Sequence, residues 1–278
     1  MSGTSTVSGG SVTNNFTGGG GAAFSTYFNS STSVTVVSSG ATTTSGAAVV
    51  GTSGSSVTVS GATAVADTSS GGNSITTTSD TAVFAAPNDT VTAASGSTTL
   101  FGASSGQTTF SLGGNGSSVV GGSGSIIGTV SGSNSTLIGG TGTSTLVVTG
   151  SNNLAVAGST GTTSIDLTQA TGANTIATNP NGGNATLIAT LGSGADSVIG
   201  GGGASTITAG SGSDVFGFVN GHAGGTEVII GFNSKDNLAF GGYGSNPISS
   251  ENVVNGSDTI VLTDGTTITL AGVDHKIF

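Results

Sequence analysis

The sequence predicts an all-β fold, a right-handed parallel β-solenoid with a separate module that closes its C-terminal end. Three observations predict it. The 278 residues include 53 glycines and many Ser, Thr, Ala and Val. Apolar residues, many of them β-branched, recur at an almost even spacing, and only three prolines interrupt them. In a chain of this kind each repeat can bury a few small apolar side chains against its neighbours, as in repeat proteins, but the chain cannot form one large core.

Composition also excludes several classes of function. The chain has twelve acidic residues, no arginine, and only Lys235 and Lys276 as basic residues. A protein that neutralises nucleic-acid phosphates needs more cations, so we expect no nucleic-acid partner. The absence of cysteine excludes disulfides and thiolate metal sites. No apolar run approaches the roughly 20 residues that cross a bilayer, so we expect no membrane span.

Residues 1–33 lack the repeat and contain no charged residue, and they carry Phe16, Phe24, Tyr27 and Phe28. Repeat proteins need their open ends covered, which makes an N-terminal cap one interpretation. The other is an assembly segment that docks on a neighbouring subunit. The first ten residues, MSGTSTVSGG, have neither a positive n-region nor an apolar h-region, so we expect no ordinary N-terminal secretion signal.

Residues 34–190 form the predicted degenerate solenoid, rich in Ser, Thr and Gly. Its apolar residues recur every eight to eleven positions, and the series continues into the next segment. The positions are Val49, Val57, Val65, Ile75, Val83, Val91, Leu100, Phe110, Val119, Ile127, Leu137, Leu146, Val156, Ile165, Ile176, Leu187, Val198, Ile207 and Phe216. The residue before each is Ser or Thr in 13 of these 19 cases, which favours short strands with stacked hydroxyl rows. Glycine-rich turns, in which Gly accepts positive φ angles, connect the strands.

Residues 191–278 begin with three nine-residue frames, Leu191–Ile199, Gly200–Thr208 and Ala209–Gly217. Glycine occupies the second and fourth places, an apolar residue the eighth, and an acidic residue the sixth in two frames. This pattern resembles the G-G-x-G-x-D-x-U-x nonapeptide of calcium-binding β-rolls, and the segment is similar to the RTX family of secreted proteins. The resemblance implies Ca²⁺ as the cofactor.

The spacing of two aspartates fits that expectation. Asp196 and Asp214 are two frames apart, so they should lie on the same edge in adjacent coils, whereas Ser205 takes the corresponding place on the other edge. Carboxylate and carbonyl oxygens form the shell that calcium prefers. The predicted metal ligands are Asp196, Asp214, Gly192, Gly194, Gly210, Gly212 and Asp236. The alternative is that both aspartates are ordinary turn residues.

Residues downstream of the frames resemble the segment that closes the roll in RTX proteins. An Asp-x-Phe-x-Phe frame starts at Asp214, and an Ile-x-x-Phe-x-x-x-Asp-x-Leu pattern follows, which includes Phe232, Asp236 and Leu238. Two strand patterns around Asp264-Gly265 then predict a hairpin. The module resembles the uncleaved export region of proteins sent out by type I secretion. This implies an extracellular or cell-surface location.

The sequence offers little for catalysis. It contains no His-Glu-x-x-His zinc motif, and its only histidines are His222 and His275. We therefore expect no enzyme. The favoured function is a secreted, self-assembling structural protein, stabilised by calcium, that forms an extracellular filament, biofilm matrix or surface layer. Its partners would be other copies of itself and a cell-surface polysaccharide. The alternatives are an adhesin or an ice- or glycan-binding solenoid and, less favoured, a secreted hydrolase.

Overall fold

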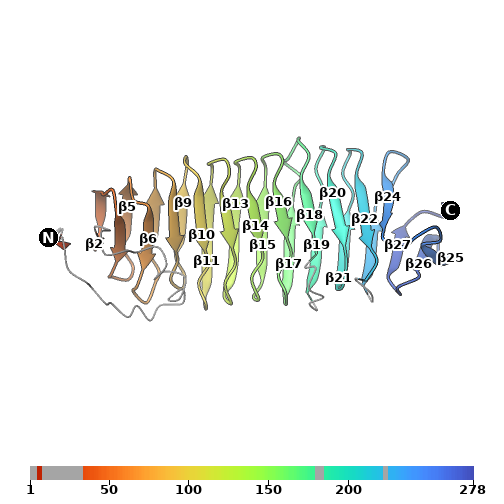
Figure 1. The fold of residues 1–278 in the computed structure, drawn as a ribbon, viewed down its shortest axis with the longest axis horizontal. Coiled ribbons are helices and arrows are strands. Elements are labelled where there is room, and N and C mark those ends of the chain that lie inside the picture. Colours follow the sequence, from red (N-terminus) through yellow and green to blue (C-terminus); the bar gives the residue numbers. More distant parts are fainter. Residues whose placement is uncertain (1–4, 8–33, 179–184, 222–224) are drawn as a thin grey trace. The chain divides into compact units, whose positions relative to one another are not determined.

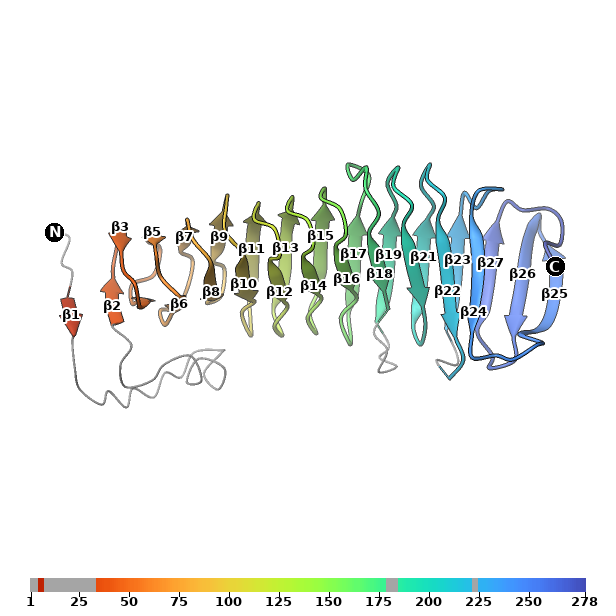
Figure 2. The same cartoon turned by 45° about the horizontal axis from the view of Figure 1, so that its top comes forward.

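The computed structural model describes residues 5–7, 34–178, 185–221 and 225–278. Their regular elements are all β-strands, β1 to β27, and none of these residues is helical. The chain forms two compact units: Met1–Thr136 with Gly140–Gly142, and Leu137–Gly139 with Thr143–Phe278. Within each unit the strands from β2 to β24 alternate between two sheets, sheet A and sheet B, and neighbouring coils lie side by side (Figure 1, Figure 2).

In the first unit, the strands of sheet A are β1 (Ser5–Val7), β2 (Val34–Val37), β4 (Ala47–Val50), β6 (Ala64–Asp67), β8 (Thr81–Phe84), β10 (Thr98–Phe101) and β12 (Ser118–Val120). Sheet B contains β3 (Gly40–Thr43), β5 (Ser56–Ser60), β7 (Ser74–Thr77), β9 (Thr90–Ala93), β11 (Gln107–Leu112) and β13 (Ser125–Val130). Neighbouring strands are parallel, except that β1 pairs antiparallel with β2.

In the second unit, sheet A contains β16 (Leu154–Val156), β18 (Thr175–Ala177), β20 (Ser197–Gly200), β22 (Val215–Val219) and β24 (Asn237–Gly241). Sheet B contains β15 (Ser144–Val148), β17 (Thr162–Asp166), β19 (Thr186–Thr190), β21 (Ala204–Thr208), β23 (Thr226–Ile230), β27 (Thr267–Ala271), β26 (Ser257–Leu262) and β25 (Ile248–Val254). The division between the units falls within β14 (Thr136–Ile138). The predicted parallel β-solenoid is thus confirmed within each unit.

Most of the predicted core positions lie on the inner faces of the strands. Leu100, for example, is fully buried and pairs in register with the buried residues Val83 and Val119. Three positions are wrong by one residue. Ile127 is 39% exposed and Val156 half-buried, while Ile126 and Ala155 are buried in their place. Val49 is buried, but it pairs with Val36, which is 43% exposed, and so lies on the outer face of sheet A.

The outer face of sheet A in the first unit is shielded from solvent at three neighbouring strands. Strands β4, β6 and β8 are buried at all of their positions, which means that both faces are shielded from solvent. Phe84 contributes to this outer cluster with Val49 and Ala66, and its ring stacks on Phe101 with centroids 4.7 Å apart. The interpretations of residues 1–33, as a cap or an assembly segment, fall on a segment of which only residues 5–7 are described, and they stay predictions.

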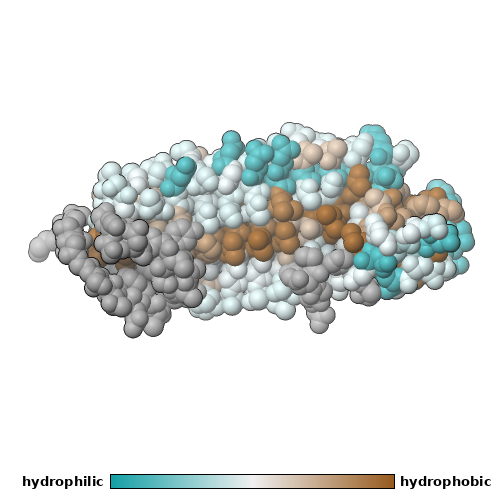
Figure 3. All heavy atoms as spheres, in the orientation of Figure 1, coloured by the Kyte–Doolittle hydropathy of each residue, from teal (hydrophilic) through white to brown (hydrophobic). Residues whose placement is uncertain are grey.

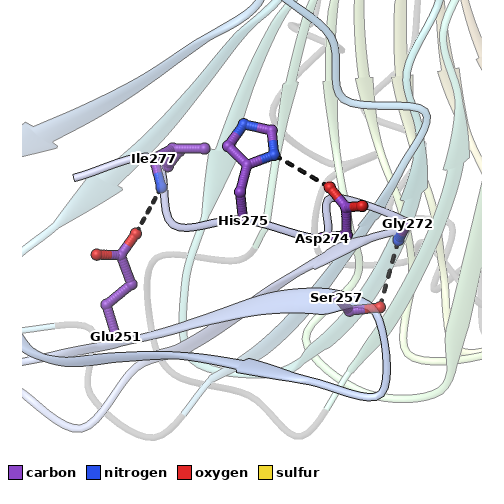
Figure 4. Close-up of polar contacts among 6 residues, drawn as sticks. All are labelled: Glu251, Ser257, Gly272, Asp274, His275 and Ile277. Carbon is purple, nitrogen blue, oxygen red and sulfur yellow. Dashed lines mark hydrogen bonds and ion pairs between the residues drawn. The ribbon is translucent and has the colours of Figure 1, made fainter.

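The C-terminal module closes sheet B of the second unit with antiparallel strands. β27 pairs in parallel with β23, and β26 and β25 follow it in antiparallel order. The predicted hairpin turn is confirmed, because Leu262 N donates to Thr266 O and Gly265 has a φ of 91°. Figure 4 shows Glu251 of β25 accepting the backbone amide of Ile277, at 2.8 Å. The last residues of the chain are thereby bonded to β25.

Candidate functional site: the stacked turns beside sheet A

One column of polar residues precedes the strands of sheet A, and we call it the Asx column. In the second unit it consists of Asn153, Asn174, Asp196, Asp214 and Asp236. The first four are at most 4% exposed and Asp236 is half-buried. Polar side chains so deeply buried need hydrogen-bond partners, and the structure supplies them from the backbone.

The first four members of the Asx column each donate a backbone hydrogen bond to the member in the next coil. The backbone amide of Asn153 donates to Oδ1 of Asn174 at 3.0 Å, and the amide of Asn174 donates to Oδ1 of Asp196 at 2.8 Å. Asp196 N donates to Oδ1 of Asp214, and Asp214 N to Oδ1 of Asp236, both at 3.0 Å. The prediction that Asp196 and Asp214 lie on one edge in adjacent coils is therefore confirmed.

The second carboxylate oxygen closes the residue's own turn. Oδ2 of Asp196 accepts Gly192 N at 3.2 Å, and Oδ2 of Asp214 accepts Gly210 N at 3.0 Å. In Asp236 the same oxygen accepts Asn233 N at 2.9 Å. Each aspartate thus satisfies two backbone amides, one within its coil and one in the preceding coil, that would otherwise be left without partners in the turn.

Burial sets the electrostatics of this column. It raises the pKa of Asp196, and the amides of Asn174 and Gly192 oppose the rise. Burial also raises the pKa of Asp214, with smaller contributions from the neighbouring carboxylates of Asp196 and Asp236. Because desolvation outweighs the amide bonds, these carboxyls hold a proton to a higher pH than free aspartate does.

The glycines of the frames are needed for close stacking. A Cβ atom on Gly210 would lie 1.8 Å from Gly192 O, and one on Gly212 would lie 1.8 Å from Gly194 O. None of these four glycines has a positive φ, so the expected turn conformation is wrong for them. The actual reason for glycine is that the carbonyl of one coil touches the Cα of the next.

These residues do not fit a preformed calcium shell. Both oxygens of Asp196 and of Asp214 already accept backbone amides, and Gly192 O accepts Ser211 N at 3.1 Å. Among the described residues, no group of three or more His, Cys, Asp or Glu side chains could hold a metal ion. The hydrogen bonds of the Asx column can hold each turn against the next without a metal ion. Calcium binding stays a prediction from the sequence.

The opposite edge contains an acid that sequence reasoning missed. Glu227 of β23 is fully buried and pairs in register with Ser205 of β21, which does lie on the other edge. Its Oε1 accepts Gly201 N at 3.1 Å, and burial raises its pKa. The alternation in Thr226–Ile230 carried the signal, because Glu227 stands two residues before the inward-facing Ile229.

A second missed feature is a buried acid pair in the first unit. Asp89 Oδ1 accepts Asn73 N at 2.9 Å and its Oδ2 accepts Ala86 N at 2.8 Å, while Asn73 Nδ2 donates to Asp67. Burial, with the nearby Asp67 carboxyl, raises the pKa of Asp89 to about 7. The two acids are 22 residues apart, and only the fold brings them together.

The structure gives no other lead toward a known class. Gly102–Gly106 has the spacing Gly-x-Ser-x-Gly, but it connects two solenoid strands, whereas the nucleophile turn of hydrolases joins a strand to a helix.

The described residues contain no helix that is long and apolar enough to span a bilayer. No protein-family model matches the sequence, and comparison with curated proteins finds no match. The fold and its turns define a β-solenoid repeat protein.

Proposed function

We propose that this chain is a structural repeat protein that associates with other copies of itself through the outer face of sheet A in the second unit. The observation that carries the proposal is an exposed apolar row on that face. Val156, Ala177, Ile199, Gly217 and Ala239 pair in register across five neighbouring strands. Their side of the sheet faces solvent, and Ile199 is 42% exposed.

Further apolar side chains widen this row into a patch. Leu154, Val215 and Val219, on the same sheet, are 37%, 36% and 43% exposed. Figure 3 shows brown, apolar residues in a band along this face of the molecule, and the band includes the part that Figure 1 labels β16 to β22. Soluble proteins rarely leave a contiguous apolar patch uncovered unless it binds something.

The first unit supports a second copy as the partner of this patch. There, the corresponding outer row of sheet A, with Val49, Ala66 and Phe84, is buried. This outer row is thus shielded from solvent at β4, β6 and β8 of the first unit, although Val36 in the same row is 43% exposed, and it is open to solvent in the second unit. In an isologous dimer the same surface of both chains meets, so this row of small and β-branched side chains would pack against its own copy.

The remaining parts of the proposal rest on the resemblance to RTX proteins. They are stabilisation by calcium, export by type I secretion and an extracellular location. The proposal includes no catalytic role, and it takes a filament, matrix or layer as the product of assembly.

Sedimentation velocity over a range of concentrations tests the association. We expect the wild-type chain to form larger species as concentration rises, and Ile199→Lys to prevent this. Ile188→Lys is the matched control, because Ile188 is 45% exposed in the same unit but belongs to sheet B. A wild-type chain that stays monomeric, or equal effects of the two variants, would contradict the proposal.

A further inference from the structure

Sheet B of the first unit carries two rows of hydroxyl groups on its outer face. One row runs across successive strands through Ser56, Ser74, Thr90 and Thr109, and it ends there because the next residue in register is Ile127 of β13. The second row, two residues further along each strand, consists of Thr58, Thr76, Thr92, Ser111 and Thr129. All nine side chains are exposed or half-buried. We call this surface the hydroxyl face.

Strand geometry makes the hydroxyl face a regular two-dimensional array. Neighbouring strands are about 4.8 Å apart, and residues two apart on one strand are separated by about 6.6 Å. The residues between the two rows, Val57, Ile75, Val91 and Phe110, are buried in the core. Because these inner side chains are packed, they hold the strands in place, so the array is rigid as well as regular.

The chemistry of the array is uniform. Its rows contain no charged and no aromatic side chain, although the whole chain has a net charge of −10. Of its nine described hydroxyls, only that of Thr109 has a side-chain partner within the protein, the Nε2 atom of Gln107 at 3.2 Å. The others keep their donor and acceptor capacity for a ligand.

The same face of the second unit lacks this regularity. The row through Thr145 and Ser164 continues into Ile188, Thr206 and Val228. The neighbouring row includes Val147, Asp166 and Ile230 among its threonines. Hydroxyl rows are therefore not a necessary product of the fold, and the first unit differs from the second in a property that a binding surface would need.

We propose that the hydroxyl face binds the surface of ice. Ice presents oxygen atoms on a fixed lattice, and a hydroxyl can replace a lattice water because it both donates and accepts a hydrogen bond. Removal of the threonine methyl groups from liquid water on binding is favourable in free energy. A polysaccharide surface is less suited, because the face has no aromatic ring on which a sugar could pack. The proposal does not depend on self-association.

Growth of a single ice crystal in a solution of the full chain tests this proposal. We expect the protein to shape the crystal and to open a gap between its melting and freezing temperatures. Thr76→Lys and Thr92→Lys place a long cation in the middle of the array and should abolish the gap. Thr190→Lys and Thr208→Lys are the matched controls, because they make the same change on sheet B of the second unit and should leave the gap intact.

Circular dichroism and urea unfolding would establish that the four variants fold as the wild type does. The proposal would be overturned if ice in the wild-type solution kept its ordinary crystal shape and showed no gap between its melting and freezing temperatures. An equal reduction of the gap by all four variants would overturn it as well. Retention of the wild type on crystalline cellulose or chitin without any effect on ice would assign the face to a polysaccharide instead. An Ile199→Lys variant that keeps the gap would separate ice binding from association.

Discussion

The backbone amide of Asp196 donates a hydrogen bond of 3.0 Å to Oδ1 of Asp214, which stands 18 residues later in the next coil. The other oxygen of Asp214 closes its own turn by accepting Gly210 N. One buried carboxylate therefore joins two coils and satisfies two amides. Asn174 performs the first of these tasks with its Oδ1 atom, so the bond between coils does not require a negative charge.

Replacement of Asp214 tests what the carboxylate contributes. Asp214→Ala leaves the amides of Asp196 and Gly210 without partners, each of which costs about 1–3 kcal/mol, so we expect a loss of roughly 2–6 kcal/mol of unfolding free energy. Asp214→Asn keeps one acceptor and should lose about half as much. Urea unfolding followed by circular dichroism in the absence of calcium measures both. Equal stability of the wild type and the alanine variant would contradict this role.

Calcium gives the same two positions a separate test. If the sequence-based prediction is correct, calcium raises the urea midpoint of the wild type, and Asp214→Asn and Asp196→Asn remove the response. Binding at 100 times the dissociation constant would add about 2.7 kcal/mol to the stability of a folded state that alone binds the ion. Magnesium at the same concentration is the control for ionic strength. A midpoint that calcium leaves unchanged would assign the Asx column a purely structural role.

The buried acids predict that the protein is more stable in mild acid than at neutral pH. The pKa of Asp89 is raised from 3.8 to about 7 by burial, so its contribution is complete below pH 3.8 and is lost as pH rises toward 7. The shift corresponds to about 4 kcal/mol, and solvent screening reduces it, so we expect a loss of about 2 kcal/mol. Asp196, Asp214 and Glu227 are shifted in the same direction.

Urea midpoints at a series of pH values between 4 and 8 measure this loss. Asp89→Asn should flatten the profile, because an amide stays neutral throughout and can still accept the amide of Asn73. Asp274→Asn is a suitable control, since the Asp274 side chain is exposed and contacts the likewise exposed side chain of His275, at 3.2 Å. A midpoint that rises from pH 4 to pH 8 would contradict the assignment.

The stacked glycines predict very different stabilities for two alanine variants whose positions are five residues apart. Gly212→Ala places a Cβ atom 1.8 Å from Gly194 O, so the turn must move, and we expect a loss of about 1–3 kcal/mol or more. Gly217→Ala places its Cβ 3.7 Å from Val198 O, an ordinary contact, and should be neutral or stabilising. Thermal unfolding compares the two. Similar melting temperatures would show that the turns yield easily.

The sequence allowed the parallel coils, the edge shared by Asp196 and Asp214, and the final hairpin to be predicted, because each depends on spacing along the chain. It did not reveal the acid pair of Asp67 and Asp89, since their proximity depends on how two coils of different length align. Nor did it reveal that the oxygens of Asp214 accept amides, because calcium ligands and turn acceptors share one residue type.

The sequence also did not reveal which of two adjacent apolar residues in a strand faces the core. Ile126 and Ile127 are adjacent and equally apolar, and a slip of one residue exchanges the two faces of a strand. At Leu154, Ala155 and Val156 the smallest residue faces the core, against the expectation that the larger ones do. The chain leaves large apolar residues outside on sheet A, which is the same feature that carries the proposal of self-association.

The two isoleucines offer a direct test of the register. Ile126 is fully buried, so Ile126→Ala should cost about 2–5 kcal/mol through lost contacts and the cavity that remains. Ile127 is 39% exposed on the outer face, and Ile127→Ala should change stability by no more than about 0.5 kcal/mol. The two proteins have the same composition, so their urea midpoints can be compared without correction. A larger loss in the Ile127 variant would mean that β13 has the opposite face toward the core.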